Sequence, residues 1–240
     1  MFQQFLSAPG AGRVSTLFRK LARHDIRHWA ITGGLAVEIH CLRLGRPSSP
    51  RTLNDVDFIA ESFDGVPESL GNDFLIRHVH PLAPPGKTML QFIDPESALR
   101  ADVFRASDRT MHRASVLEFP ERALRLISLE DLLARTARLA LALAEAVPTP
   151  AKHAVDFLRL AELIDPAAVE AAWQDHRKPK HPAGFHETNL LLRDLIPASR
   201  SLLITPEHSK DIEQVCPRCA PTAAFPLADP KMVFSVIGYC

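Results

Sequence analysis

The spacing of apolar residues changes at Ser128, and this change constrains the fold more than any other feature of the chain. Before Ser128, short runs rich in β-branched and aromatic residues alternate with prolines and glycines, as is typical of strands and turns. After it, Leu129, Leu132, Leu133 and Leu139 follow the spacing of one helix face. The sequence therefore predicts an α+β protein, with a mixed sheet flanked by helices and then a helical C-terminal part.

The first half contains an amphipathic helix and several β-like runs. Val14, Leu17, Phe18 and Leu21 recur at helical spacing. The β-like runs cover residues 28–32, 55–60, 74–79, 88–93 and 100–106. The first run ends in two consecutive glycines, and helix-forming residues follow at 35–44. This segment therefore predicts a strand, a glycine turn and a helix.

The second half shows helix starts and stops. Ser128 can cap a helix with Asp131 three residues later, and Pro148 and Pro150 are expected to end that helix. Helices are predicted at 151–163 and 166–174. Beyond residue 196 the chain is proline-rich and has no clear periodicity. We therefore expect an α/β core at 1–125, a helical domain at 126–195 and a tail of undefined structure at 196–240.

Charge and hydropathy exclude some classes of protein. The 28 lysines and arginines balance the 28 aspartates and glutamates, so no global positive field gathers nucleic acid or an anionic membrane. The most apolar stretch, 132–147, is interrupted by charged residues and is shorter than the roughly 20 residues of a spanning helix. The N-terminus lacks the pattern of a secretory signal. We expect a cytoplasmic protein without membrane contact, whose four cysteines are free thiols or metal ligands.

Two aspartates, Asp55 and Asp57, stand two residues apart within an apolar run. On a strand, alternation points both side chains to the same side, with their Cα atoms about 7 Å apart. Two carboxylates in an apolar setting repel each other and are costly to desolvate unless a cation neutralises them. Mg²⁺ suits this pair because it prefers carboxylate oxygens and keeps positions open for water and phosphate.

A third aspartate, Asp102, lies in the β-like run at 100–106, from which an adjacent strand can bring its carboxylate to the same ions. Three carboxylates are able to bind two metal ions about 3.5 to 4 Å apart, which clamp the attacking and leaving oxygens of an in-line displacement. Gly33 and Gly34 add a place for phosphates, because residues without Cβ let backbone N–H groups approach a triphosphate at the start of a helix. Each signal alone is common in unrelated proteins, but together, in this order, they favour phosphoryl-type chemistry.

The order of these motifs resembles the nucleotidyltransferase superfamily typified by DNA polymerase beta. Its signature is a strand, Gly-Gly or Gly-Ser, a helix, an Asp-x-Asp and a later strand aspartate. Here residues 31–38 read Ile-Thr-Gly-Gly-Leu-Ala-Val-Glu, residues 51–59 read Arg-Thr-Leu-Asn-Asp-Val-Asp-Phe-Ile, and residues 101–104 read Ala-Asp-Val-Phe. Over about residues 14–165 the chain is similar to small bacterial nucleotidyltransferases, including abortive-infection toxins and aminoglycoside nucleotidyltransferases.

The resemblance implies roles for particular residues. Asp55 and Asp57 would bind both Mg²⁺ ions, and Asp102 would bind the catalytic ion and help to activate the attacking hydroxyl. Gly33 and Gly34 would seat the triphosphate. The candidate phosphate contacts are Arg51 and Lys152.

The sequence also departs from the pattern of its relatives. Arg135 stands where a lysine often follows the leucines of the first helix in the second half. His153 stands where many relatives have an acidic residue after the lysine. All three metal-binding acids are present, so the resemblance implies an active enzyme.

The implied activity is magnesium-dependent transfer of a nucleoside monophosphate from ATP or another NTP to an acceptor hydroxyl, with release of pyrophosphate. The acceptor is either an RNA end such as that of a tRNA, a protein hydroxyl or a small molecule such as an aminoglycoside. The alternative from a different class is a non-catalytic partner protein, one half of a toxin–antitoxin pair, that uses the same fold as an interaction surface.

Two further features leave alternatives open. Cys216 and Cys219 form a single C-x-x-C, which is either a pair of free thiols or, with His208 and Cys240, a zinc site that stabilises a nucleic-acid module. The basic cluster at 177–181 is either an RNA contact or a solvated loop. Few aromatic residues are interleaved with it, so the sequence shows no stacking platform for single strands.

Overall fold

The computed structural model describes residues 2–4, 6–46, 55–63, 66–81, 87–118 and 123–204. Its α-helices are α1 (Ala8–Leu21), α2 (Gly33–Arg43), α3 (Leu70–Asp73), α4 (Thr110–Arg113), α5 (Leu129–Ala140), α6 (Ala151–Leu160), α7 (Glu170–His176) and α8 (Phe185–Ala198). Its 3₁₀ helices are η1 (Phe2–Gln4), η2 (Leu141–Glu145), η3 (Pro166–Val169) and η4 (Arg200–Leu202).

The strands form one large mixed sheet and one small pair. The large sheet has the order β3-β4-β5-β2-β1-β7-β6. Its members are β1 (Trp29–Thr32), β2 (Asp55–Ala60), β3 (Leu75–Pro81), β4 (Lys87–Asp94), β5 (Leu99–Arg105), β6 (Ser115–Leu117) and β7 (Leu124–Leu126). In its centre β2 runs parallel to β5 and antiparallel to β1. The small pair joins β8 (Thr149–Pro150) to β9 (Leu203–Ile204).

One face of the large sheet carries an aromatic core. Phe58 of β2 lies between Phe18 of α1, at 6.1 Å between ring centroids, and Trp29 of β1, at 5.7 Å. Trp29 also contacts Phe92 of β4 at 6.0 Å. All four side chains are buried. The amphipathic pattern of α1 is explained by this contact, since its apolar stripe covers the sheet.

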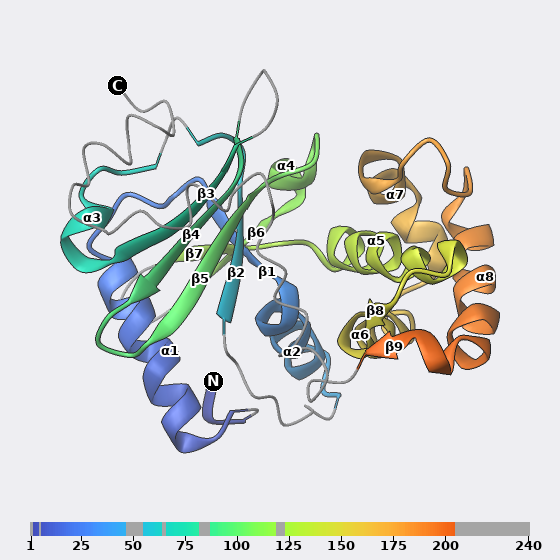
Figure 1. The fold of residues 1–240 in the computed structure, drawn as a ribbon, viewed down its shortest axis with the longest axis horizontal. Coiled ribbons are helices and arrows are strands. Elements are labelled where there is room, and N and C mark those ends of the chain that lie inside the picture. Colours follow the sequence, from blue (N-terminus) through green and yellow to red (C-terminus); the bar gives the residue numbers. More distant parts are fainter. Residues whose placement is uncertain are drawn as a thin grey trace.

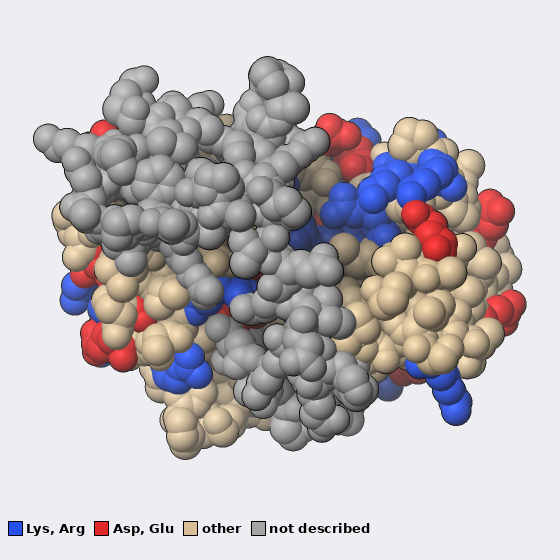
Figure 2. Space-filling view, viewed as in Figure 1, with Lys and Arg blue, Asp and Glu red and all other residues tan. Residues whose placement is uncertain are grey.

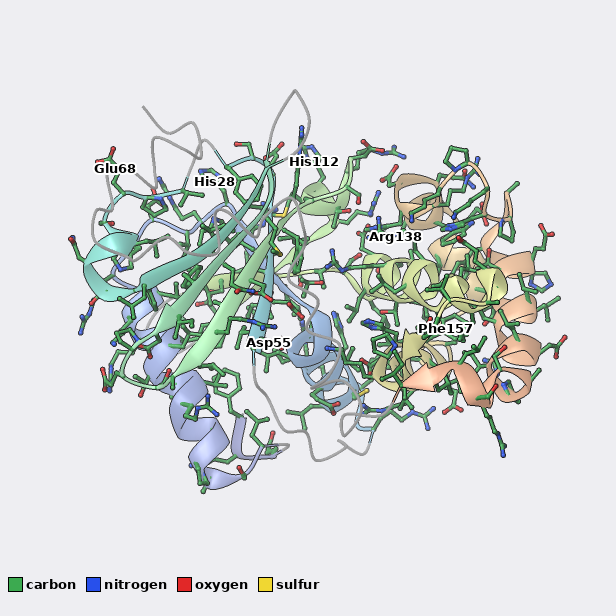
Figure 3. All side chains as sticks on the ribbon, in the orientation of Figure 1. His28, Asp55, Glu68, His112, Arg138 and Phe157 are labelled. Atoms are coloured by element: carbon green, nitrogen blue, oxygen red, sulfur yellow. The ribbon has the colours of Figure 1, made fainter. Side chains whose placement is uncertain are left out.

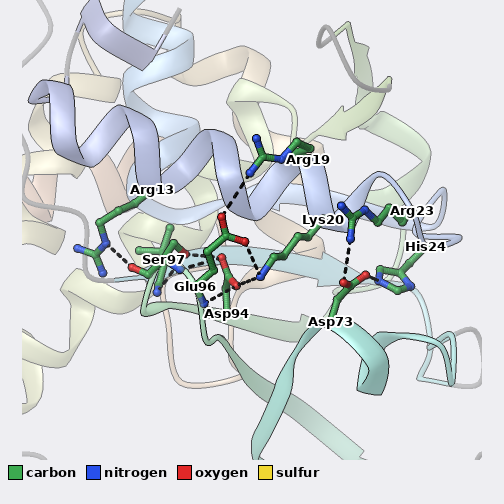
Figure 4. Close-up of polar contacts among 10 residues, drawn as sticks. Arg13, Arg19, Lys20, Arg23, His24, Asp73, Asp94, Glu96 and Ser97 are labelled. Atoms are coloured by element: carbon green, nitrogen blue, oxygen red, sulfur yellow. Dashed lines mark hydrogen bonds and ion pairs between the residues drawn. The ribbon is translucent and has the colours of Figure 1, made fainter.

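Polar contacts fix α1 against this face (Figure 4). The buried ammonium of Lys20 donates to Asp94 at the end of β4, at 2.5 Å. Arg13 donates to the backbone carbonyl of Ser97 at 2.7 Å. At the other end of the helix, His24 and Arg23 both contact the carboxylate of Asp73. With this face closed, the opposite face of the sheet is left for the site described below.

The helical part is built around α5, which contacts α6, α7 and α8. Figure 1 shows these helices gathered beside the sheet, with α2 between the two parts. This position of α2 is supported by its contacts with β1 and β2 on one side and with α5 and α6 on the other. No helix in the described part of the chain is long and apolar enough to cross a bilayer.

The predicted α+β class is confirmed, and the predicted helix at Ser128 begins there, with the Ser128 side chain accepting a hydrogen bond from the Asp131 N–H. Several elements differ from prediction, among them the short helices α3 and α4 and the pair β8–β9, which were not predicted. The α-helix ends at Ala140 rather than at the prolines, and it continues as η2. The short strands β6 and β7 were not predicted, because three residues are too few to show an alternation. Helix α8 was not predicted either.

Candidate active site

Three carboxylates lie together on the face of the sheet opposite α1. Asp55 and Asp57 are on β2, and Asp102 is on the neighbouring β5. Because β2 and β5 are parallel and in register, Asp57 lies directly opposite Asp102. Side chains on opposed residues of adjacent strands share one face. The structure therefore brings together the three acids that the sequence singled out, and Figure 3 shows Asp55 beside the start of α2.

Gly33 makes the closest backbone approach to this cluster. Its φ of +63° lies in the left-handed region, and a Cβ at this position would stand 2.0 Å from Oδ2 of Asp57. A side chain at Gly33 is therefore excluded twice, by the backbone conformation and by the carboxylate. Gly34 follows as a residue of α2. The glycine pair thus opens α2 directly against the carboxylate of Asp57.

The residue before the glycines, Thr32, presents an unsatisfied hydroxyl. Thr32 is fully buried and lies opposite Asp57 across the β1–β2 pair. Its Oγ1 has no hydrogen-bond partner in the described part of the chain, and it does not cap α2. A buried polar atom without a partner is rare and is often completed by a ligand. This hydroxyl and the first N–H groups of α2 are therefore hydrogen-bond donors suited to binding an anion.

The electrostatics of the cluster are unfavourable to three anions. Burial, the charge of Asp55 and the charge of Asp102 raise the pKa of Asp57 to about 7, although Arg135 and Lys152 act in the opposite direction. A carboxyl group with so high a pKa is half-protonated near neutral pH. The site therefore has an affinity for added positive charge.

Two further side chains contact the acids. The guanidinium of Arg100, on β5, donates to Asp55 at 2.5 Å, and its Nε lies 3.3 Å from Oδ2 of Asp102. The amide of Gln91, on β4, donates to Oδ1 of Asp102 at 2.9 Å. Sequence reasoning missed both residues, because only the pairing of β4, β5 and β2 places them beside the acids.

The donor chemistry fits a divalent metal ion. In the described ranges, no three histidine, cysteine, aspartate or glutamate side chains stand ready as a metal cage. The three carboxylates nevertheless share one face, and burial together with the charges of Asp55 and Asp102 raises the pKa of Asp57. Oxygen ligands and unneutralised charge are what Mg²⁺ requires. Asp55, Asp57 and Asp102 are thus the residues that could hold it.

The helical part supplies cations to the same place. Arg135 of α5 lies over the ring of Phe104 of β5, with 5.0 Å from its Cζ to the ring centroid, and its charge acts on Asp57. Lys152, an exposed residue at the start of α6, also acts electrostatically on Asp57. Lysine and arginine side chains gather where the helical part faces the sheet (Figure 2). The sheet thus offers acids, and the facing helices offer positive charges that act on the same acids.

The remaining predicted residues are placed as follows. Arg51 and the cysteines at 216, 219 and 240 lie outside the described residues. The basic cluster at 177–181 follows α7, where His181 stacks on Trp173 and Lys180 pairs with Glu145. Trp173 and Phe185 are buried core residues, so they form no stacking platform for bases.

Comparison with known proteins gave structural likenesses only. No family model matches the chain, and no curated protein matches its sequence. Among solved structures, the antibiotic-resistance factor ANT(2'')-Ia is similar at 17% identity, covering 69% of this chain and 91% of that one, with a TM-score of 0.44. An antigenic nucleotidyltransferase-like protein from Paracoccidioides brasiliensis is similar at 17% identity, over 82% and 95%, with a TM-score of 0.43.

A third similar structure is JHP933 from Helicobacter pylori, at 14% identity over 80% of this chain and 94% of that one, with a TM-score of 0.35. The chain thus spans most of the length of each of these proteins. Because all three TM-scores lie below 0.5, the assignment of a function rests on the residues of this chain.

Proposed function

We propose that the chain is a magnesium-dependent nucleotidyltransferase that moves a nucleoside monophosphate from an NTP to an acceptor hydroxyl. The observation that carries the proposal is the position of Asp57, which lies opposite Asp102, two residues from Asp55 and directly against Gly33. This arrangement unites three oxygen ligands with the start of a helix. Phosphoryl-transfer sites need both, because the metal and the phosphates must bind side by side.

The nucleotide would bind where α2 begins. The N–H groups of Gly33 and Gly34 and the buried hydroxyl of Thr32 would donate to phosphate oxygens. Arg135 and Lys152 would neutralise phosphate charge from the helical part, as their effect on Asp57 supports. Arg51 remains a candidate phosphate contact on sequence grounds alone.

The chemistry is a single in-line displacement. Mg²⁺ held by Asp55, Asp57 and Asp102 would neutralise charge on the α-phosphate and on the leaving pyrophosphate. Asp102 would accept the proton of the acceptor hydroxyl as the new bond from that oxygen to the α-phosphorus forms and the bond to the β-phosphate oxygen breaks. The residues contribute chiefly by positioning and by charge neutralisation, which suffice for this class of reaction.

The acceptor is an RNA end, a protein hydroxyl or a small molecule. The residues at the site distinguish none of the three, and the balanced overall charge favours no polyanion. ATP is the donor to test first, followed by the other NTPs.

The proposal is tested by following which phosphate of the NTP is transferred to the product. Each NTP carrying label on either the α- or the γ-phosphate is incubated with the purified protein, Mg²⁺ and a cell extract. We expect the α-label to enter a product and the γ-label to leave as pyrophosphate. Asp57→Asn should reduce transfer at least about 100-fold, whereas Asp194→Asn, on the exposed side of α8, should not change it. Transfer of the γ-label, or no transfer with any NTP, would overturn the proposal.

A second candidate is a non-catalytic partner protein of a toxin–antitoxin pair. It is favoured by one observation, the engagement of Asp55 and Asp102 by Arg100, which partly neutralises the cluster without a metal. The same experiment separates the two candidates. A protein that transfers no label and copurifies with a stable protein partner would support this reading.

A further inference from the structure

Arg100 lies within the acid cluster, beside two of its three carboxylates. It pairs in register with Asp55 across β2 and β5, and it precedes Asp102 by two residues, so all three side chains share one face. Its Nη2 donates to Oδ2 of Asp55 at 2.5 Å, and its Nε lies 3.3 Å from Oδ2 of Asp102. One guanidinium therefore bridges two of the three carboxylates.

These contacts use the same oxygens that a metal ion would need. Oδ2 of Asp55 and Oδ2 of Asp102 face Arg100, and Oδ1 of Asp102 accepts a hydrogen bond from Gln91. Asp57 differs from them, since within the described ranges its carboxylate forms no hydrogen bond or ion pair. Asp57 is thus open to a cation, whereas Asp55 and Asp102 are engaged. A carboxylate oxygen cannot serve a guanidinium and a tightly coordinated Mg²⁺ in the same direction.

The environment of Arg100 makes this competition strong. Its side chain is 27% exposed, that of Asp55 is 23% exposed and that of Asp102 is 7% exposed. Ion pairs at this depth are screened much less than surface pairs. A divalent ion that displaces the guanidinium must therefore break a real charge-assisted interaction.

We propose that Arg100 is an internal counter-cation of the acid cluster. In the metal-free protein its guanidinium occupies the carboxylates of Asp55 and Asp102, and a divalent ion must displace it to bind there. The inference rests on the proposed function, because it takes the three acids to be the metal site. Arg100 is a positioning residue in this account. Its displaced guanidinium finds new partners in the phosphates of a nucleotide, so nucleotide and metal bind cooperatively.

The test measures binding of Mn²⁺, a spectroscopic stand-in for Mg²⁺, to the full chain without nucleotide, by electron paramagnetic resonance of the free ion. Arg100→Met keeps an unbranched apolar stem and removes the guanidinium with its charge. We expect it to bind Mn²⁺ about 10-fold more tightly than the wild type. The control is Arg105→Met, which removes the same charge from the exposed end of the same strand, three residues beyond Asp102, and should leave the affinity unchanged.

Cooperativity gives a second readout. A non-hydrolysable nucleotide should raise the Mn²⁺ affinity of the wild type by a larger factor than that of Arg100→Met, because the variant has no guanidinium to release. If Arg100→Met does not fold, as judged by circular dichroism, Arg100→Lys replaces it. Lysine lacks the planar fork that bridges two carboxylates, so we expect an affinity a few-fold tighter than the wild type.

The outcomes are separable. Mn²⁺ affinity that is equal or weaker in Arg100→Met, or in Arg100→Lys where it replaces that variant, would overturn the role of Arg100 while leaving the metal site intact. An equal gain in Arg105→Met would show a general effect of net charge and would overturn it too. Failure of every protein, wild type included, to bind Mn²⁺ with or without nucleotide would remove the metal site itself and with it the proposed function.

Discussion

Replacing Asp57 with asparagine is expected to stabilise the metal-free protein at pH 8. The half-buried carboxylate of Asp57 is poorly solvated and stands beside Asp55 and Asp102, which raises its pKa from 3.8 to about 7. A carboxyl group whose pKa is higher in the folded than in the unfolded chain binds its proton more tightly when folded. Folding stability therefore falls as the pH rises from about 4 to about 7, and above that range the loss is complete. Asparagine has no charge to lose, so the variant avoids this penalty.

The pKa difference sets the size of the effect. At about 1.4 kcal/mol per pH unit, it corresponds to a ceiling of about 4 kcal/mol. Asp57 is partly exposed, and solvent screening reduces such effects, so we expect about 2 kcal/mol. For a chain of this length, this corresponds to a rise of about 4 to 8 °C in melting temperature.

Urea unfolding in the presence of EDTA, at pH 5 and at pH 8, measures the effect. Asp57→Asn should be more stable than the wild type at pH 8 and nearly equal to it at pH 5, where Asp57 is protonated. The matched control, Asp194→Asn on α8, should show no such difference between the two pH values. A variant that is equally or less stable than the wild type at pH 8 would refute the claim that burial and the neighbouring acids make an ionised Asp57 costly at this site.

Three other perturbations follow from the structure. Gly33→Ala should lower the free energy of unfolding in urea by at least about 3 kcal/mol, because Gly33 has a positive φ and lies against Asp57. Gly45→Ala is the control: Gly45 has a φ of +66° but open space around its Cβ position, so the cost should be only about 1 kcal/mol. Equal costs would show that the contact with Asp57 is unimportant. Arg113→Ala leaves the fully buried carboxylate of Asp131 without its bidentate partner and should lower the free energy of unfolding by about 3 kcal/mol. Arg109→Ala removes only an exposed guanidinium that lies 3.6 Å from Asp175, and it should cost less than about 1 kcal/mol. A loss of similar size in both variants would contradict the burial argument. Arg135→Gln should weaken the binding of a non-hydrolysable NTP about 10-fold, as measured by calorimetry. Arg193→Gln, on the distant α8, should leave the affinity unchanged. Unchanged affinity in Arg135→Gln would show that Arg135 does not belong to the nucleotide site.

The elements that pack one apolar face against the core could be predicted from the sequence. Helix α1 shows a clean stripe because its buried residues face the sheet, and β2 and β5 show apolar runs because they are central strands. Helix α8 was missed for a physical reason. Its Leu190 and Leu191 are exposed, at 52% and 38%, which blurs the stripe that would have marked the buried face.

The residues of the candidate site likewise divide into those that the sequence could predict and those that it could not. Asp55, Asp57 and Gly33 are close in sequence to strand and turn signals, so their chemistry could be predicted. Arg100 could not, because its role depends on the register between β2 and β5, which places it opposite Asp55. Thr32 could have been found, since a hydroxyl directly before a glycine pair lies where the helix begins, but that its Oγ1 lacks a partner is visible only in three dimensions.

Anomalous diffraction from a crystal grown with Mn²⁺ and a non-hydrolysable NTP would test the metal site directly. The account predicts an anomalous peak within coordination distance of the carboxylates of Asp57 and Asp102, with the phosphates at the start of α2 and with Arg100 turned away from Asp55. A peak elsewhere in the molecule, or acids still bridged by Arg100 with no ion between them, would contradict it.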